Sequence, residues 1–527
     1  MNPRDRLSLG ILQGGALLVV LAAVPYKLFD LDRFFVPKEL VLAGVMLLLA
    51  VFAIARTRSF SLRRADELLA ASVLLTVASG AFATNHWLAE RAIAVTLGGA
   101  TCYWCARRLA RTEDLFALVS VLAFAGVLGA ITSLLQAYGV QTELFSLNRA
   151  PGGTFGNRNF MAHLGAITLP AIMFCGVRAR SSRRTSFWCA GTALVGAALM
   201  LSRTRAAWLA LIAGFAVFLI GSAIALRQRD DTMKLSRLWL LIGALVAGPA
   251  ASLVLPNTLD WRSDSPYMET AQGLVNYKGG SGHGRLVQYG NSLKMSLRHP
   301  LLGVGPGNWA VIYPHFASEN DPSLTSDGLA ANPWPSSDWV AFISERGVPA
   351  AALLGLALLV LFVNGVQGLF RETSSEARLA SAVFLATLVT LMIVGMFDAV
   401  LLLPAPTLIG WSLLGALSPH AESRRIVPLG TAARWTVVAI VGLAGGGAVA
   451  RSGAEIGAMS LFNSSTKLAT LERASTLDPG SYRIHVRLAD AYEKRGDCRK
   501  ARPHASAAKA LFPYSPIARR LAASCGG

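Results

Sequence analysis

Long apolar blocks separated by short polar segments make up most of the chain. About thirteen of these blocks are long enough to cross a membrane, which takes roughly 17–25 mostly apolar residues. Their approximate centres are residues 17, 47, 75, 97, 126, 168, 194, 216, 246, 359, 390, 410 and 442. The block at 404–417 is short and is expected to pair with its neighbour as a helical hairpin. The pattern predicts an all-α, polytopic membrane protein with about 12–13 transmembrane helices.

Two longer polar regions divide the chain. Residues 256–347 form a large loop between an N-terminal transmembrane bundle at 1–255 and C-terminal transmembrane helices at 348–450. The loop is rich in Gly, Pro, Ser and Asn, and a long connection in a compact bundle is usually functional or disordered. Its aromatic residues favour a folded loop packed on the membrane surface. They are Trp309, Tyr313, Phe316, Trp334 and Trp339.

The second polar region is the tail at 458–527, which has a helix–turn–helix pattern. Its small residues resemble a tetratricopeptide repeat, because small side chains at these spacings let two helices pack closely. The matching positions are Ala474, Leu477, Asp478 and Pro479, then Leu488, Ala489, Tyr492, Gly496, Ala501, Ala505, Ala508, Phe512 and Pro513. One and a half repeats is fewer than the three that such units usually need. A plain helical hairpin resting on the membrane domain is therefore an equal alternative.

Composition supports the membrane assignment. Of the 527 residues, 53% are hydrophobic and 15% are charged, whereas soluble domains average about 25% charged residues. The net charge of +19 would suggest a nucleic-acid partner in a soluble protein. Here Lys and Arg lie mostly between apolar blocks, so membrane topology explains the charge and no nucleic acid is expected.

The distribution of Lys and Arg also predicts orientation. Basic residues are concentrated in segments on the same side as the N-terminus, such as 56–64 and 178–184. Such segments normally face the cytoplasm. The loop at 256–347 and the tail after residue 451 are then periplasmic. The apolar block at 9–24 lacks a clear cleavage site and is expected to remain in the membrane.

The six cysteines fall into two groups. Cys102 and Cys105 lie in an apolar segment, where packing is a better explanation than redox chemistry. Cys498 and Cys525 lie in the polar tail. A periplasmic tail is in an oxidising compartment. A disulfide that fastens the last helix is therefore predicted, with two free thiols as the alternative.

Three polar stretches on the predicted outside face are candidates for chemistry. They are 149–160, 202–208 and 283–347. Arginines at a membrane boundary can simply reach to lipid headgroups. Arg203 and Arg205 fit that explanation poorly, because they stand in a very short outside loop. Charge kept at such a position usually marks a substrate path, and guanidinium suits phosphate. A polyprenyl pyrophosphate is therefore a candidate ligand.

The motifs in these stretches resemble the O-antigen ligase and polymerase superfamily of bacterial membrane glycosyltransferases. The resemblance covers roughly residues 1–420. It rests on the order and spacing of GTFGNRNFMAHL, SRTRAAWLAL, the stretch from Arg285 through HPLLGVGPGNW, and SDWVAFISERG.

The resemblance implies a GT-C-type enzyme of the bacterial inner membrane that uses neither a metal nor a cofactor. At the periplasmic face, a glycan would move from a polyprenyl pyrophosphate to an acceptor hydroxyl. The acceptor is lipid A core in ligases, another repeat unit in polymerases and a protein side chain in O-oligosaccharyltransferases. Arg205 and Arg285 would contact the pyrophosphate, with Arg203, Arg158 and Asn159 completing the substrate site.

The chain departs from the family near the end of the loop. Related sequences commonly read AHNDYL or AHSDWV there, and that His is the proposed catalytic base. This chain has Ser336 at the His position. An unactivated serine cannot accept a proton at neutral pH. Asp338, His315 and Glu345 are the nearby titratable residues, and Asp338 and His315 are the predicted catalytic residues.

Two other classes of function stay open from the sequence. A transporter or flippase could use Asp398 as an intramembrane proton site, but the two halves show no internal repeat. The competing account places Asp398 near the outside end of its span, facing the same cavity as the arginines. A non-catalytic scaffold, recruiting a protein partner through the tail, would explain the missing loop His.

Overall fold

The computed structural model describes residues 3–109, 115–226, 235–273, 280–419 and 425–525. Within these ranges there are twenty α-helices and two four-residue strands, which confirms an all-α fold. Each apolar block predicted from the sequence is a helix. These thirteen helices are α1 (Pro3–Leu21), α2 (Asp32–Phe52), α3 (Arg64–Gly80), α4 (His86–Leu109), α5 (Leu115–Ala137), α6 (Arg158–Arg178), α7 (Ser182–Ser202), α8 (Arg205–Leu226), α9 (Leu235–Val254), α13 (Asp338–Arg371), α14 (Ser375–Phe397), α15 (Pro404–Ala416) and α16 (Thr431–Ser464).

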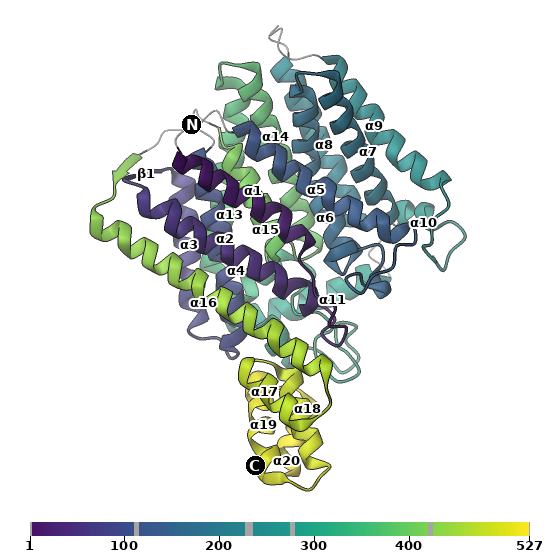
Figure 1. The fold of residues 1–527 in the computed structure, drawn as a ribbon, viewed down its shortest axis with the longest axis vertical. Helices are drawn as coiled ribbons and strands as arrows, with labels where there is room; N and C mark the ends of the chain where they lie inside the picture. Colours follow the sequence, from purple (N-terminus) through teal and green to yellow (C-terminus); the bar gives the residue numbers. More distant parts are fainter. Residues whose placement is uncertain (1–2, 110–114, 227–234, 274–279, 420–424, 526–527) are drawn as a thin grey trace.

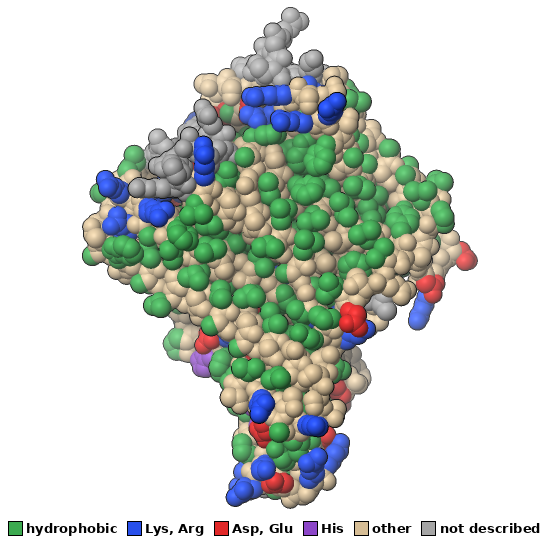
Figure 2. Space-filling model, viewed as in Figure 1, with side chains coloured by type: hydrophobic (Ala, Val, Ile, Leu, Met, Phe, Trp, Pro, Cys, Tyr) green, Lys and Arg blue, Asp and Glu red, His purple; other side chains and the backbone are tan. Residues whose placement is uncertain are grey.

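Nine helices of the described residues are long and apolar enough to cross a membrane. α3 and α15 are shorter, with 17 and 13 residues. On the face drawn in Figure 2, hydrophobic side chains cover the middle of the bundle, and Lys and Arg gather towards its ends. This arrangement is expected of a multi-pass membrane protein, since a bilayer accepts apolar side chains and excludes charge.

The bundle is built around α6. Every residue of α6 from Phe160 to Val177 is buried, as expected for a helix that is apolar on all sides. α16 runs obliquely along one edge of the bundle (Figure 1) and packs mainly on α2. β1 (Ser59–Leu62) pairs antiparallel with β2 (Arg425–Pro428) beside the start of α16, an addition that the apolar pattern did not predict.

The described residues of the loop at 256–347 are folded. It contains α10 (Pro266–Gln272), α11 (Gly280–Arg298), α12 (Trp309–Ile312) and a 3₁₀ turn at Tyr313–His315. Trp309 and Tyr313 are fully buried in a small core with Met295 and Val304, and the predicted packing of the loop on the membrane surface stays a prediction. The Tyr313 hydroxyl donates to Asp321 Oδ2 at 2.8 Å. Burial and this carboxylate raise the pKa of Tyr313, so the hydroxyl stays a donor.

The tail consists of α17 (Leu468–Leu477), α18 (Tyr482–Glu493), α19 (Cys498–Leu511) and α20 (Pro516–Ser524), packed as successive antiparallel helices. The predicted helix–turn–helix pattern is therefore present, and its assignment as a tetratricopeptide repeat stays a prediction. The tail projects from the end of the bundle opposite the N-terminus (Figure 1). It contacts the loop there, where His315 stacks on Tyr514 at 4.7 Å between ring centroids. We call this end of the bundle the loop end.

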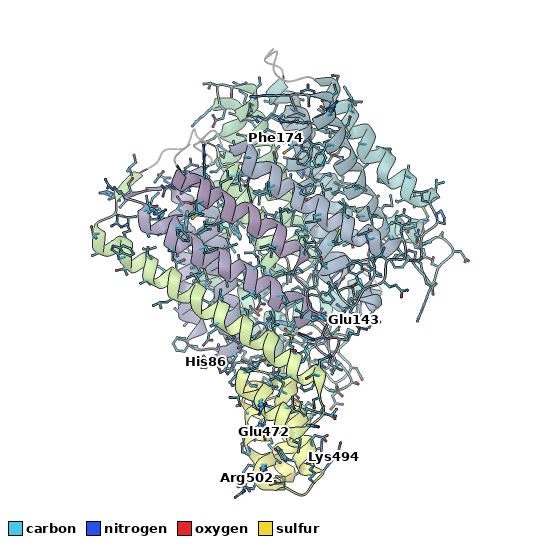
Figure 3. The ribbon with its side chains drawn as sticks, viewed as in Figure 1. His86, Glu143, Phe174, Glu472, Lys494 and Arg502 are labelled. Atoms are coloured by element: carbon cyan, nitrogen blue, oxygen red, sulfur yellow. A yellow bond between two sulfur atoms is a disulfide. The ribbon has the colours of Figure 1, made fainter. Side chains whose placement is uncertain are left out.

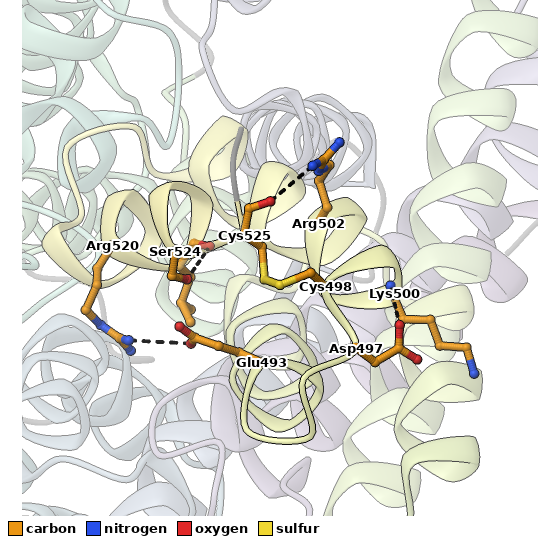
Figure 4. Close-up of a disulfide and its surroundings, with 9 residues drawn as sticks. Glu493, Asp497, Cys498, Lys500, Arg502, Arg520, Ser524 and Cys525 are labelled. Carbon is orange, nitrogen blue, oxygen red and sulfur yellow. Dashed lines mark hydrogen bonds and ion pairs between the residues drawn. A yellow bond between two sulfur atoms is a disulfide. The ribbon is translucent and has the colours of Figure 1, made fainter.

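The predicted disulfide joins Cys498 to Cys525, with 5.3 Å between their Cα atoms (Figure 4). Cys498 is the first residue of α19, and Cys525 follows α20. The Arg502 guanidinium donates to the Cys525 carbonyl at 3.1 Å, so the same turn is also held by a hydrogen bond. The bridge fastens α20 against α19.

Replacing both cysteines with serine is expected to loosen α20 while the membrane domain stays folded. The bridge joins residues 27 apart, and closing such a loop is worth about 2–4 kcal/mol. Limited proteolysis of protein from native membranes should therefore cut near residue 515 in the double variant and spare the wild type. Mass mapping without reductant tests the bridge itself, and two free thiols in the wild type would contradict it.

The loop and the tail both lie at the loop end of the bundle, so a single experiment on membrane orientation tests both. The charge asymmetry predicts that reporter fusions after residues 320 and 460 both read as periplasmic. A fusion after residue 180, at the other end of α6, should read as cytoplasmic and serves as the control. A cytoplasmic result at either 320 or 460 would reverse or break the predicted topology.

Candidate functional site

A buried glycine turn at 152–156 sets the start of α6. Gly156 has a left-handed φ of +71°, and a Cβ added there would lie 2.2 Å from the Phe34 ring. The Gln136 side-chain oxygen accepts from Gly153 N at 2.8 Å. The Asn157 side chain then caps α6. This turn fixes the next two residues, Arg158 and Asn159, at the loop end. In Figure 3, Glu143 lies near this end and Phe174, far along α6, lies near the other.

Two predicted arginines lie against one indole ring. The guanidinium carbons of Arg158 and Arg203 are 4.9 and 4.8 Å from the centroid of Trp261. Cation–π contact stabilises each charge, but it also brings two like charges to one ring. An anion bound here would relieve that repulsion. The sequence indicated the arginines, and it gave no reason to single out Trp261.

The short connection between α7 and α8 carries Arg203 and Arg205. Arg203 has a φ of +53°, a left-handed conformation that is uncommon for residues other than Gly and that concentrates at functional sites. Its Nε donates to Thr270 Oγ1 at 2.9 Å. Arg205 donates to the Gly273 carbonyl at 2.6 Å. α10 and Gly273, the residue that follows it, therefore hold both guanidinium groups at the loop end. The carboxylate of Glu269 lies 3.6 Å from Arg203 and offsets part of its charge.

Asn159 links these arginine turns to the end of α14. Its amide nitrogen donates to Asp398 Oδ2 at 3.3 Å, and its amide oxygen accepts from Thr204 Oγ1 at 3.1 Å. Asp398 is the residue that directly follows α14. Asp398 therefore lies at the loop end, beside the predicted substrate residues. This position agrees with the alternative to the transporter hypothesis, which placed Asp398 near the end of its span.

α11 carries Arg285 and contacts Ser336, the residue that stands at the position of the family His. The Gln288 side-chain oxygen accepts from Ser336 N at 2.7 Å, and the Tyr289 hydroxyl lies 2.6 Å from the Ser336 carbonyl. The same hydroxyl lies 3.0 Å from the Met396 carbonyl, two residues before Asp398. Arg285 is one turn before Tyr289 on the same face of α11. Ser336, Arg285 and Asp398 are thus grouped around one junction.

Asp338 is fully buried at the first turn of α13, and its carboxylate binds the backbone that follows Asp398. Oδ1 accepts from Val400 N and Oδ2 accepts from Leu401 N, each at 2.9 Å. Its neighbour Ser337 caps α13 and donates to the Gly395 carbonyl at 3.0 Å. The carboxylate therefore shapes the segment that presents Asp398. Its predicted role as a base stays a prediction.

The structure places His315 apart from this group. Its ring stacks on Tyr514 of the tail and meets Phe316 edge-on at 5.1 Å. These contacts put His315 at the junction of loop and tail, whereas the predicted substrate residues gather around α6, α8 and α14. Its role as a base also stays a prediction.

The HPLLGVGPGNW stretch and the SDWVAFISERG motif pack on each other through Glu345. The Glu345 carboxylate accepts from Gly307 N at 2.9 Å and from Trp309 N at 3.2 Å. Gly303 and Gly347 both have left-handed φ angles, and an added Cβ would collide with backbone of the facing segment at either one. The glycine-rich stretch is therefore an anchor that fixes the start of α13, and Glu345 is part of that anchor.

The site is rich in cations and contains two carboxylates. Arg158, Arg203, Arg205 and Arg285 bring four positive charges, against the two carboxylates of Glu269 and Asp398. Such a set can bind a pyrophosphate and stabilise it as a leaving group. Within the described ranges, no three His, Cys, Asp or Glu side chains come together as a metal site would require.

Comparison with known families gives the class of protein. Residues 190–355 match the model of the O-antigen ligase family. This segment is less than half of the chain, and its match confirms the resemblance to the O-antigen ligase superfamily seen in the motifs. The matched segment contains Arg203, Arg205, Arg285, His315 and Asp338. No curated protein matches the chain.

Proposed function

We propose that the protein transfers a glycan from a polyprenyl-pyrophosphate donor to an acceptor hydroxyl at the periplasmic face of the bacterial inner membrane. The observation that carries this proposal is the pairing of Arg158 and Arg203 on Trp261, next to Arg205 and the Asn159–Asp398 contact. A family of glycan ligases supplies the general class of reaction.

In this reaction the acceptor oxygen forms a bond to the anomeric carbon of the donor sugar. The bond from that carbon to the pyrophosphate oxygen breaks, and the pyrophosphate leaves with the electron pair. The arginines bind the charge that develops on the leaving group, which is a major way to lower such a barrier. The acceptor hydroxyl proton passes to a protein group. Asp338 and His315 are the groups that the sequence predicts.

The apolar middle of the bundle suits the polyprenyl chain. The lipid would lie among the exposed apolar side chains of the spans, with its two phosphates at the loop end. Lipid A core as acceptor makes the protein an O-antigen ligase. A second glycan makes it a polymerase, and a protein Ser, Thr or Tyr makes it an O-oligosaccharyltransferase.

Purified protein in liposomes, given a polyprenyl-pyrophosphate glycan, tests the proposal. Lipid A core, a short glycan and a Ser/Thr-containing peptide are offered in parallel, and product is followed by mass spectrometry. Transfer to one of them is expected, and the acceptor used distinguishes the three activities. Donor binding without any turnover would favour the scaffold. Movement of intact donor across the bilayer would favour the transporter.

A further inference from the structure

The tail carries a large excess of positive charge. Residues 465–525 contain twelve Lys and Arg against five Asp and Glu, which gives a net charge of +7. All twelve basic side chains are exposed, and Figure 2 shows Lys and Arg along the tail down to its far end. They are Lys467, Arg473, Arg483, Arg487, Lys494, Arg495, Arg499, Lys500, Arg502, Lys509, Arg519 and Arg520.

The acidic residues of the tail are partly buried, and each is held by a contact within the tail. They are Glu472, Asp478, Asp490, Glu493 and Asp497. Glu472, for example, accepts from the Tyr492 hydroxyl at 2.8 Å. Within residues 465–525, Lys494 and Arg520 are the only two exposed cations that pair with a carboxylate. The negative charge is therefore used inside the tail, and most of the positive charge faces outward.

The exposed cations follow the faces of two neighbouring helices. Arg483, Arg487 and Lys494 are spaced by four and seven residues, which places them on one face of α18. The set with spacings of three and seven on α19 is Arg499, Arg502 and Lys509. In Figure 3, Lys494 and Arg502 lie towards the far end of the tail, away from the bundle. We call these two helix faces the basic surface.

Three observations narrow the kind of partner. A protein interface normally has an apolar centre, but Leu477 is the only large exposed hydrophobic residue in the described tail, and it lines a cavity against α4 and α16. A bilayer would be met by the part of the tail nearest the bundle, whereas the basic surface extends to the far end. The Cys498–Cys525 bridge fits an oxidising compartment, which argues against a nucleic acid of the cytoplasm. A flexible polyanion outside the cytoplasm fits all three.

We propose that the basic surface binds an acidic glycan, a chain whose sugars carry carboxylate, sulfate or phosphate groups. Repeated anions on a flexible chain meet many separate cations, so no single deep pocket is required. The anionic character of the partner follows from the charge of the tail. Its being a glycan rests on the proposed function, which places a glycan at the loop end. The tail contacts that end, where His315 stacks on Tyr514. The basic surface therefore raises the local concentration of the chain beside the site.

Binding is tested with the full-length protein in nanodiscs of phosphatidylcholine. Fluorescently labelled polygalacturonate is the acidic probe, and dextran of the same length is the neutral one. The wild type should bind polygalacturonate and leave dextran free. Its affinity should fall at least about tenfold between roughly 50 and 200 mM NaCl, because salt screens the charges and opposes counterion release.

Two triple variants separate charge from folding. R487Q/R499Q/K509Q removes three exposed cations that form no ion pair or hydrogen bond with the residues that the structure describes. It is expected to lower the affinity for polygalacturonate about tenfold and to flatten its salt dependence. R487K/R499K/K509R keeps every charge and should bind as the wild type does.

The matched control removes as many charges from the opposite end of the bundle. R180Q/R183Q/R184Q changes three exposed arginines there and should bind polygalacturonate as the wild type does. Equal loss of affinity in this control would indicate a bulk effect of net charge and would overturn the proposal. Wild-type affinity in R487Q/R499Q/K509Q, or equal binding of dextran, would overturn it as well.

The remaining outcomes separate this proposal from its alternatives and from the proposed function. If nanodiscs that contain phosphatidylglycerol abolish polygalacturonate binding, the basic surface lies on anionic lipid and the glycan assignment is wrong. Glycan transfer by a wild-type protein that binds no polygalacturonate overturns the inference and leaves the proposed function intact. Binding without transfer to any acceptor establishes the basic surface and removes the proposed function.

Discussion

Replacing Arg205 or Arg285 with alanine is expected to abolish glycan transfer while leaving the protein in the membrane. Both guanidinium groups lie at the loop end, Arg205 at the first turn of α8 and Arg285 in α11. If they bind the pyrophosphate, each arginine has its largest effect in the transition state, when the leaving group gains charge. Removing one such electrostatic contact typically costs about 10²–10³-fold in kcat. The liposome assay measures kcat, and donor binding is followed separately with a labelled lipid-linked glycan.

Two sets of variants sharpen this prediction. Lysine at either position should rescue poorly, because an ammonium lacks the planar fork that binds two phosphate oxygens at once. R298A is the matched control for Arg285, since Arg298 is an exposed residue of the same helix. Arg205 also donates to the Gly273 carbonyl, so the thermal stability of R205A must be compared with that of R205K. Wild-type transfer by both alanine variants would remove these arginines from the donor site.

The sequence was sufficient for features that depend on local composition. The apolar blocks predicted every spanning helix, since a run of about 20 apolar residues in lipid has few alternatives to a helix. The Arg203–Arg205 turn was recognisable because two charges stand between two apolar blocks. The tail disulfide followed from two cysteines in one polar region.

The remaining features of the site depend on contacts between distant segments. Trp261 stands in a polar stretch without periodicity, so its place between Arg158 and Arg203 could not be predicted. The sequence predicted Asp338 as a catalytic residue of the loop. In the structure its carboxylate accepts hydrogen bonds from backbone amides 62 and 63 residues away.

His315 offers a test of how loop and tail work together. If His315 is the base, H315A should lower kcat strongly and Y514A should have little effect, because Tyr514 carries no group that accepts protons at neutral pH. If the His315–Tyr514 stacking only docks the tail, the two variants should change activity and proteolysis of the tail to the same small extent. Aromatic pairs of this kind contribute about 0.5–1.5 kcal/mol. The ratio of the two kcat values therefore decides between the roles.

Asp338→Asn is expected to lower kcat by about 10²–10³-fold, and the structure suggests a physical reason besides general-base catalysis. The buried carboxylate accepts from Val400 N and Leu401 N. An amide keeps one acceptor and turns its NH₂ group towards a backbone N–H. A buried donor is then left without a partner, at a cost of about 1–3 kcal/mol. The segment that presents Asp398 should shift as a result.

Stability and kcat together distinguish the two roles of Asp338. Loss of a base should lower kcat with the thermal stability unchanged, and loss of the backbone anchor should lower both. S337A is the matched control, because it removes the neighbouring contact to the Gly395 carbonyl without touching a carboxylate. A decrease in kcat and thermal stability in S337A, in the same direction as in D338N but smaller, would show that the reaction depends on the position of the segment between α14 and α15. Wild-type kcat in D338N would show that neither role of Asp338 limits transfer, and the proton would then have to leave through another group at the same junction.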